Sequence, residues 1–205
     1  MSKKTVLVTG GCGFIGSHLV EALVQKNYRV RILDNFSTGK RENLSSIDKR
    51  ELEIFTGCIS DWQTVASAIK GCDCVFHEAA IASVTKSIQD PVGTGKINYN
   101  GTLNVLEAAR KYDVRRVIFA GSAAVYGNNL TLPKKESMPT EPLTPYAVDK
   151  LASELMGHVY AKNFGIEFVC LRYFNVFGRR QEPSNPYSGV ISNRMIVAEK
   201  KENEL

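Results

Sequence analysis

Residues 5–16 read Thr5-Val6-Leu7-Val8-Thr9-Gly10-Gly11-Cys12-Gly13-Phe14-Ile15-Gly16. The first five residues have the length and composition of a buried strand, and a helical spacing of apolar side chains follows at Leu19, Val20 and Leu23. Glycines at positions 10, 13 and 16 permit a tight turn, close approach of a ligand to the backbone, and close packing of helix against strand. The stretch therefore predicts a strand, a glycine turn and a helix in direct succession.

The same alternation of strand-length and helix-length segments continues along the chain. It is typical of a parallel sheet covered on both faces, a doubly wound α/β Rossmann fold, in which ligands bind at the carboxyl ends of the strands. The predicted strands are Thr5–Thr9, Arg29–Leu33, Leu52–Thr56, Cys74–His77, Arg116–Ala120 and Glu167–Leu171. The predicted helices are Gly16–Lys26 and segments near Trp62–Lys70, Tyr99–Tyr112 and Tyr146–Asn163. Between Asn128 and Pro145 the prolines predict a long loop, and such loops are usually functional.

The glycine turn has the context of a dinucleotide-binding motif. Its helix N-terminus offers free N–H groups and a partial positive charge to a pyrophosphate. Asp34 ends the second predicted strand, where an acid can accept both ribose hydroxyls and would repel the 2′-phosphate of NADP. Lys40 and Arg41 lie nearby and are the counter-evidence. The balance favours NAD over NADP as the cofactor.

A tyrosine and a lysine four residues apart share one face of a predicted helix. Thr144 has the character of an N-cap and Pro145 of a first helical residue, so Tyr146 falls in the first turn and Lys150 in the next. Lowering a phenol pKa from about 10 to about 7 requires roughly 4 kcal/mol. An ammonium about 4 Å away supplies that order of energy at an effective dielectric constant near 20. The helix dipole adds up to about 1 kcal/mol and the nicotinamide cation adds more, so we expect these charges together with Lys150 to make Tyr146 an acid–base group.

The composition points away from several other classes of protein. The chain of 205 residues is 43% hydrophobic and 23% charged, and its net charge of +5 never gathers into the long basic run typical of nucleic-acid binding. No apolar stretch has the length of a membrane span, so we expect neither nucleic-acid nor membrane partners, and a cytoplasmic location. The five cysteines are expected to be reduced, and Cys72-x-Cys74 lacks the second pair of ligands that a metal site needs.

Taken together, the motifs resemble the extended short-chain dehydrogenase/reductase family, and more narrowly its nucleotide-sugar epimerases. The resemblance runs along essentially the whole chain. Its motifs are the glycine turn, Asp34, Ser122 at the end of a strand, the Tyr-x-x-x-Lys pair, His77-Glu78-Ala79-Ala80, Asn98-Tyr99-Asn100-Gly101-Thr102, Val125-Tyr126-Gly127 and Arg172-Tyr173-Phe174-Asn175-Val176-Phe177-Gly178. Residues 174–181 look most like the UDP-N-acetylhexosamine 4-epimerase branch, with UDP-glucose/galactose epimerases as the next choice.

The resemblance implies a role for each of several residues. The catalytic residues would be Ser122, Tyr146 and Lys150. Contacts to NAD are implied for Gly10, Gly13, Phe14, Ile15, Gly16, Asp34, Asn35, Ser37, Thr38, Gly39, Lys40, Cys58, Ile59, Ala79, Ala80, Asn98, Tyr146, Lys150 and Phe174. Contacts to the nucleotide sugar are implied for Ser83, Ser122, Tyr146 and Asn175, and less firmly for Ser87. No residue is expected to bind a metal.

The implied activity is NAD-dependent 4-epimerisation of a UDP-hexose, N-acetylated or not, through a transient 4-keto sugar. Two alternatives stay open: a non-catalytic NAD-binding protein, and another nucleotide-sugar oxidoreductase or decarboxylase. Dehydratases of the family carry acids just after the position of Ser122, where this chain has Ala123 and Ala124, so dehydration is not expected. A homodimer is implied through Gly101–Tyr112 and Tyr146–Asn163.

The chain departs from the family pattern in two places. Family members commonly have an acid at the position of Cys58 that contacts adenine, and a thiol is a poor substitute, so weaker cofactor binding is expected. Members also continue into a substantial C-terminal lobe. We therefore expect residues 1–178 to form the NAD(P)-binding Rossmann domain. Residues 179–205 would be the start of a truncated substrate-binding region, with that lobe mostly absent.

Overall fold

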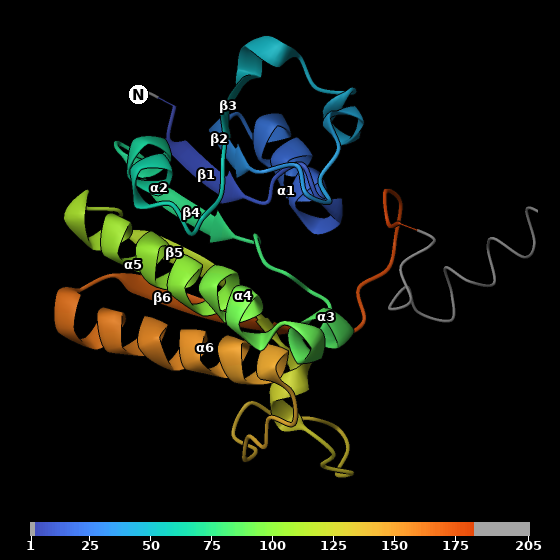
Figure 1. Ribbon diagram of the computed structural model, residues 1–205. Helices are drawn as coiled ribbons and strands as arrows, with labels where there is room; N and C mark the ends of the chain where they lie inside the picture. Colours follow the sequence, from blue (N-terminus) through green and yellow to red (C-terminus); the bar gives the residue numbers. More distant parts are fainter. Residues whose placement is uncertain (1–2, 183–205) are drawn as a thin grey trace, which may run out of the picture.

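A computed structural model describes residues 3–182 of the chain. Six parallel strands form one sheet in the order β3-β2-β1-β4-β5-β6, which confirms the doubly wound Rossmann fold (Figure 1). The strands are β1 (Thr5–Thr9), β2 (Arg29–Asp34), β3 (Leu52–Thr56), β4 (Cys74–His77), β5 (Arg116–Ser122) and β6 (Glu167–Tyr173). Because β1 pairs with both β2 and β4, the strand order reverses direction beside β1, and a ligand crevice is expected at the carboxyl ends of β1 and β4.

Helices cover both faces of the sheet. They are α1 (Phe14–Gln25), α2 (Trp62–Ile69), α3 (Val84–Gln89), α4 (Pro91–Gly95), α5 (Gly101–Lys111) and α6 (Pro145–Phe164), with the π-helix η3 (Lys96–Asn100) and the 3-10 helices η1 (Arg41–Leu44), η2 (Lys49–Glu51) and η4 (Ala123–Tyr126). In Figure 1, α5 and α6 lie side by side. None of the helices within residues 3–182 is long and apolar enough to cross a membrane.

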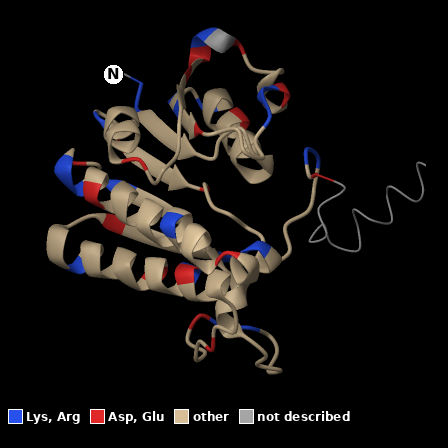
Figure 2. Ribbon diagram, viewed as in Figure 1, with Lys and Arg blue, Asp and Glu red and all other residues tan. Residues whose placement is uncertain are grey.

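Strand β1 divides the core into two layers because its side chains alternate between the faces of the sheet. Val6 and Val8 pack with Val20 of α1, whereas Leu7 packs with apolar side chains of α2 and α5, among them Val65. All of these residues are at most 3% exposed. Positively and negatively charged residues are interspersed along the helices and loops, as Figure 2 shows with Lys and Arg in blue and Asp and Glu in red.

The structure corrects some predicted boundaries. Helix α1 begins at Phe14 rather than at Gly16, because Gly13 already has the extended backbone of an N-cap. Strands β5 and β6 stay paired as far as Ser122 and Tyr173, two residues further than predicted for each strand. The segment predicted as one helix over Tyr99–Tyr112 begins as η3 and continues as α5. The short helices α3 and α4 were not predicted.

Residues 179–182 lie against α1. The Nε2–H group of His18 donates to the carbonyl oxygen of Arg179 at 2.9 Å, and Arg180 forms an ion pair with Glu21 at 2.8 Å. The rest of the region expected to begin substrate binding, residues 183–205, lies outside the described residues. The domain boundary at residue 178 therefore stays a prediction.

Candidate active site

The glycine turn between β1 and α1 has no room for side chains. Gly10 has φ +69°, and a Cβ atom on it would lie 2.9 Å from the backbone nitrogen of Ala79. A Cβ atom on Gly16 would collide with the carbonyl oxygen of Gly10. No side chain caps the start of α1 at Gly13, so the first N–H groups of the helix are left for another acceptor. The turn thus has the close backbone approach and the free N–H groups that a pyrophosphate requires.

Hydrogen bonds to the Asp34 side chain hold the following loop beside this turn. Its carboxylate is 7% exposed and accepts hydrogen bonds from the Cys12 N–H at 2.9 Å and the Phe36 N–H at 2.8 Å. The Lys40 N–H donates to the Cys12 carbonyl oxygen at 2.9 Å. The loop of residues 35–40, which we call the ribose loop, therefore lies beside the glycine turn. Carboxylate lone pairs beyond the two used here remain as acceptors for ribose hydroxyls.

The two cations near Asp34 both have partners. The Lys40 ammonium forms an ion pair with Glu182 at 2.7 Å, and the Arg41 guanidinium lies over the Phe36 ring, 4.5 Å from its centroid. These cations were the sequence evidence for a 2′-phosphate. In the structure both are engaged with other groups.

Cys58 and Ile59 follow β3 at the same edge of the sheet. Cys58 is half-buried and its sulfur accepts a hydrogen bond from the Ser60 hydroxyl at 3.2 Å. Ile59 is 3% exposed, and its carbonyl oxygen accepts a hydrogen bond from the Asn104 side chain at 3.0 Å. The thiol thus sits where the sequence predicted a contact to adenine, and that contact stays a prediction.

Ser122 and Tyr146 meet at the carboxyl end of β5. Ser122 is the last residue of the strand, and Tyr146 is in the first turn of α6, where the Thr144 hydroxyl accepts from the Ala147 N–H at 3.2 Å. The N-cap and first-turn assignments are thereby confirmed. A hydrogen bond with Ser122 lowers the pKa of the Tyr146 phenol, although burial is the larger effect and raises that pKa above its usual value.

Lys150 lies one turn after Tyr146 on α6 and reaches across to β5. Its ammonium donates to the Ala120 carbonyl oxygen at 2.8 Å and lies 5.9 Å from the centre of the Tyr146 ring. Burial lowers the pKa of Lys150 to about 8, opposed by the carboxylate of Glu78. Only burial and the Ser122 hydrogen bond shift the pKa of Tyr146 here, so its lowering by Lys150, the helix dipole and the nicotinamide cation together stays a prediction. Loss of water around the phenol outweighs the Ser122 hydrogen bond and raises this pKa.

Asn98, predicted to contact NAD, is engaged by the chain itself. Its side-chain oxygen accepts from the Ile81 N–H at 2.8 Å, and its amide group donates to the Ile81 carbonyl oxygen at 3.1 Å. These bonds hold the segment 79–81 after β4, which contains the predicted cofactor residues Ala79 and Ala80. Asn98 is 3% exposed, so its role in the structure is to place that segment.

The residues predicted to contact the sugar differ in burial and in hydrogen bonding. Ser83 caps α3 by accepting from the Lys86 N–H at 3.1 Å. Ser87 is fully buried and donates to the Val84 carbonyl oxygen at 2.7 Å, so its hydroxyl does not face a ligand here. Beyond β6, Asn175 is exposed, and Phe174 is 61% exposed and stacks on Tyr126 with ring centres 6.5 Å apart.

Arg172, for which no role was predicted from the sequence, contacts three separate parts of the structure. Its guanidinium makes two hydrogen bonds to Glu154 of α6, at 3.0 and 2.7 Å, and one to the Tyr126 hydroxyl at 2.9 Å. A further bond reaches the Glu136 carbonyl oxygen at 3.3 Å. Arg172 thus holds together η4, which follows Ser122, the loop after η4, and α6, which carries Tyr146. The only sign of Arg172 in the sequence was its place in the motif of residues 172–178.

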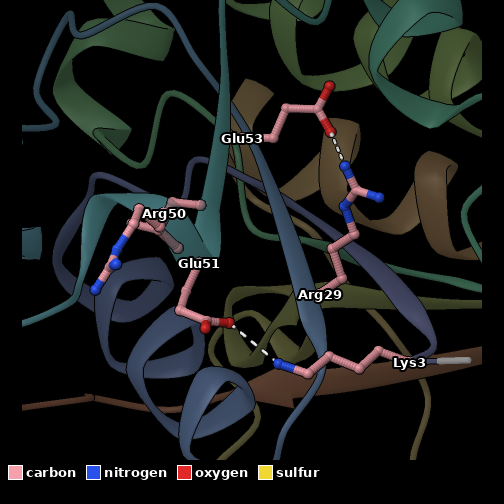
Figure 3. Close-up of a pocket in the computed structure, with 6 residues that line it drawn as sticks. Lys3, Arg29, Arg50, Glu51 and Glu53 are labelled. Atoms are coloured by element: carbon pink, nitrogen blue, oxygen red, sulfur yellow. Dashed lines mark hydrogen bonds and ion pairs between the residues drawn. The ribbon is translucent and has the colours of Figure 1, made fainter.

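A separate surface hollow lies at the amino ends of β1, β2 and β3, opposite the ends that carry the glycine turn, and Figure 3 shows the residues that line it. Lys3 pairs with Glu51 at 3.2 Å, and Arg29 pairs with Glu53 at 3.9 Å. Its lining is Lys3, Arg29, Arg50, Glu51, Leu52 and Glu53. Because opposite charges neutralise one another there, the hollow presents no convergent set of catalytic groups. Within residues 3–182 there is also no cluster of three or more His, Cys, Asp or Glu side chains that could hold a metal ion.

The comparisons with known proteins agree with this geometry. A family model described as the NAD dependent epimerase/dehydratase family matches residues 6–205. The chain belongs to this family. Membership confirms the family resemblance of the sequence and identifies NAD as the cofactor to which the family's chemistry is tied. The glycine turn, the uncapped α1 and Asp34 fit such a dinucleotide.

Members of the NAD-dependent epimerase/dehydratase family resemble the chain closely in both sequence and structure. A UDP-glucose 4-epimerase of Halalkalibacterium halodurans is 37% identical over 200 residues, covering 94% of this chain and 58% of that relative. The structure of a UDP-N-acetylglucosamine 4-epimerase from Methanobrevibacter ruminantium, in complex with UDP-N-acetylmuramic acid, has a TM-score of 0.92 at 40% identity. That match covers 98% of this chain and 64% of the other.

A UDP-glucose 4-epimerase of Thermus thermophilus in complex with NAD is similar with a TM-score of 0.83 and 41% identity, covering 90% of this chain and 59% of that one. The chain thus spans about three fifths of the length of the curated relatives it matches.

Proposed function

We propose that the protein is an NAD-dependent 4-epimerase of a UDP-hexose, acting on UDP-N-acetylglucosamine and UDP-N-acetylgalactosamine or on UDP-glucose and UDP-galactose. The observation that carries the proposal is the contact between Ser122 and Tyr146 at the carboxyl edge of the sheet. The same edge holds the glycine turn and Asp34, so a bound dinucleotide and a sugar hydroxyl would meet there.

Each catalytic side chain has a defined task in this proposal. Tyr146 takes the proton of the sugar 4-hydroxyl, directly or through Ser122. NAD, when bound, supplies the hydride acceptor and later the hydride donor at C4. The 4-keto sugar turns in the pocket and is reduced on its other face while Tyr146 returns the proton. Because the oxidation and the reduction cancel, no external oxidant is consumed.

The raised pKa of Tyr146 sets a condition on this chemistry. A buried phenol holds its proton at neutral pH, so its pKa must fall when the site is loaded. Positive charge brought close to a phenol lowers its pKa. Lys150 can contribute more strongly if its ammonium exchanges the Ala120 carbonyl for a contact nearer the phenol. The proposal therefore assigns Lys150 a charge role that depends on cofactor binding.

The proposed cofactor is NAD rather than NADP. Asp34 is buried beside the glycine turn, where a 2′-phosphate would meet a carboxylate. Lys40 and Arg41, the two cations that would favour the phosphate, already pair with Glu182 and Phe36. The remaining site residues inferred from the family, among them Phe14, Ile15 and Asn175, keep their proposed roles.

The choice of reaction rests on the relatives and on two residues. The relatives include a UDP-N-acetyl-alpha-D-glucosaminuronate decarboxylase of Bacillus cytotoxicus that is 36% identical, and a dTDP-glucose 4,6-dehydratase structure from Streptomyces venezuelae with 32% identity. Ala123 and Ala124 follow Ser122 where an acid would be needed to eliminate water. A net oxidoreductase or decarboxylase is the second candidate, and it would give stoichiometric NADH or carbon dioxide.

The test is an equilibrium assay of UDP-sugar interconversion with Tyr146→Phe. The variant should lose turnover and keep NAD binding, because only the phenol hydroxyl is removed. Tyr160→Phe is the matched control on the same helix, since its hydroxyl bonds to Glu107 at 3.2 Å, away from Ser122. Near-normal turnover by Tyr146→Phe would overturn the assignment. NAD binding without interconversion by the wild type would favour a non-catalytic NAD-binding protein.

We further propose a homodimer paired through α5 and α6. Val148, Leu155 and Val159 lie along one side of α6 at helical spacing, and they are 49%, 58% and 48% exposed. Sedimentation at micromolar concentration should show a dimer for the wild type and a monomer for Leu155→Lys. A wild-type monomer would contradict the proposal. The cytoplasmic location stays a prediction.

A further inference from the structure

A buried chain of hydrogen bonds runs through His77, the last residue of β4. The imidazole is 1% exposed. Its Nδ1 atom lies 2.7 Å from the hydroxyl oxygen of Thr9, the last residue of β1. Its Nε2 atom lies 3.0 Å from the hydroxyl oxygen of Thr102 in α5. One ring thus connects two neighbouring strands of the sheet with a helix above it.

The partners of the two hydroxyls fix the direction of every bond. The Thr102 hydroxyl donates to the Asn98 carbonyl oxygen at 2.6 Å, so its oxygen must accept from the Nε2–H of His77. A neutral imidazole has one N–H group, so Nδ1 accepts and the Thr9 hydroxyl donates to it. The Thr9 oxygen then accepts from the Ala79 N–H at 3.2 Å. With a neutral ring, this chain of hydrogen bonds therefore requires the Nε2–H tautomer.

The surroundings of the ring also favour the neutral form. Burial lowers the pKa of His77 to about 3, and the ammonium of Lys150 on α6 adds to this effect. Phe119 of β5 packs against the imidazole with ring centres 5.7 Å apart, and it offers no acceptor. Glu78, the next residue, has its carboxylate bonded to the Tyr173 hydroxyl at 3.2 Å. A second proton on the ring would leave the Thr9 hydroxyl without its acceptor.

Both ends of this chain of hydrogen bonds lie in segments that are predicted to bind the cofactor. The Ala79 N–H begins the segment 79–81, and Asn98 holds the far end of that segment through its two bonds to Ile81. The Asn98 carbonyl oxygen also lies within 3.4 Å of the Ser153 hydroxyl, on the helix that carries Tyr146. His77 is therefore linked to the cofactor-binding segment, the π-helix and α6.

We propose that His77 is a positioning residue for the NAD site. In a single, neutral Nε2–H tautomer, His77 holds the segment 79–81 in the geometry that binds NAD. The NAD part of the proposal rests on the proposed function. The alternative is a histidine that stabilises the core without affecting the cofactor. The two differ in whether a folded variant without the hydrogen bonds still binds NAD normally.

The first measurement is nitrogen NMR of the full chain labelled at its three histidines, with His77→Gln used to assign the signal. We expect a protonated Nε2 and a bare Nδ1 for His77, unchanged across the neutral pH range. The opposite tautomer, or titration of His77 near its usual pKa of about 6.5, would overturn the proposal. This measurement does not depend on NAD binding.

The second measurement is the affinity for NAD⁺ by titration calorimetry. His77→Leu should weaken binding by about tenfold, which corresponds to about 1.4 kcal/mol. His77→Gln should recover most of the affinity, because its amide oxygen can accept from Thr9 and its amide N–H can donate to Thr102. His158→Leu, on α6, is the control and should bind as the wild type does. Normal affinity in a folded His77→Leu variant would overturn the proposal.

Thr102→Val keeps the test decisive if His77→Leu does not fold. It removes the hydroxyl between His77 and Asn98 while keeping nearly the same volume. NAD affinity should fall in this variant, and unchanged affinity would count against the positioning role. A wild-type chain that binds no NAD would instead refute the proposed function, while the tautomer measurement would still stand.

Discussion

Lys150 donates a hydrogen bond from its ammonium to the backbone carbonyl oxygen of Ala120 over 2.8 Å. This bond links α6 to the interior of β5, two residues before Ser122. It satisfies one of the three ammonium protons in a site where the lysine is 5% exposed. Lys150, which we propose as a catalytic residue, is therefore also a hydrogen-bond donor to the sheet.

Lys150 should make stability rise with pH in the alkaline range. Its pKa is lowered from 10.5 to about 8, so between these values the unfolded chain holds a proton that the folded chain has lost. Below that window both states are protonated, and burial of the charge costs stability in full. Raising the pH through the window removes this cost. Lys150→Met removes the effect altogether.

The measurement is the free energy of unfolding of the wild type minus that of Lys150→Met, from urea titrations at pH 7 and pH 10. This difference isolates Lys150 from buried thiols such as Cys74, whose raised pKa acts in the opposite direction. We expect the difference to move in favour of the wild type at the higher pH. A difference that does not change with pH would contradict the burial of a charged lysine.

Ser122→Ala should raise the pKa of Tyr146. The Ser122 hydroxyl is the hydrogen-bond partner that opposes the effect of burial on this phenol, so its removal leaves burial unopposed. Ultraviolet titration of tyrosine ionisation would follow the change. Subtracting the titration of Tyr146→Phe, made in each background, isolates this one phenol from the other seven of the eight tyrosines. An unchanged or lower pKa would show that the two side chains do not interact.

Gly10→Ala should be much more damaging than Gly71→Ala, although both glycines have positive φ, +69° and +78°. An alanine at Gly71 meets nothing within 4 Å and bears only the left-handed strain of about 1–2 kcal/mol. An alanine at Gly10 also meets the backbone of Ala79, which should cost about 2 kcal/mol more and abolish NAD binding. Thermal and urea unfolding measure the difference, and equal losses would contradict a closely packed turn.

Glu154→Gln should strongly destabilise the protein. The carboxylate forms a two-bond pair with Arg172, and the side chains are 8% and 15% exposed. Removing one partner of a buried pair leaves an uncompensated charge, at a cost of about 3 kcal/mol. Glu51→Gln is the matched control, because its pair with Lys3 is 43% exposed on both sides and is worth at most about 1 kcal/mol. Similar effects of the two substitutions in urea unfolding would show that the Arg172 pair is not buried in solution.

Local sequence signals predicted much of the fold and some fine detail. Thr144 and Pro145 begin α6 as predicted, because capping is a matter of neighbouring residues. Helices α3 and α4 also begin at capping residues, Ser83 and Asp90, which the sequence displays. They escaped prediction because helices of six and five residues are too short to show a periodic apolar pattern.

The sequence by itself determined the order of strands and helices, the glycine turn and the residue types at the strand ends, because each follows from periodicity or from a short motif. Only the tertiary structure decided how the polar side chains pair. The Lys150 ammonium donates to the Ala120 carbonyl oxygen, and the His77 imidazole lies between the hydroxyls of Thr9 and Thr102. Those outcomes depend on burial and on partners distant in sequence, since loss of water shifts a pKa and a hydrogen bond needs an acceptor at a particular place.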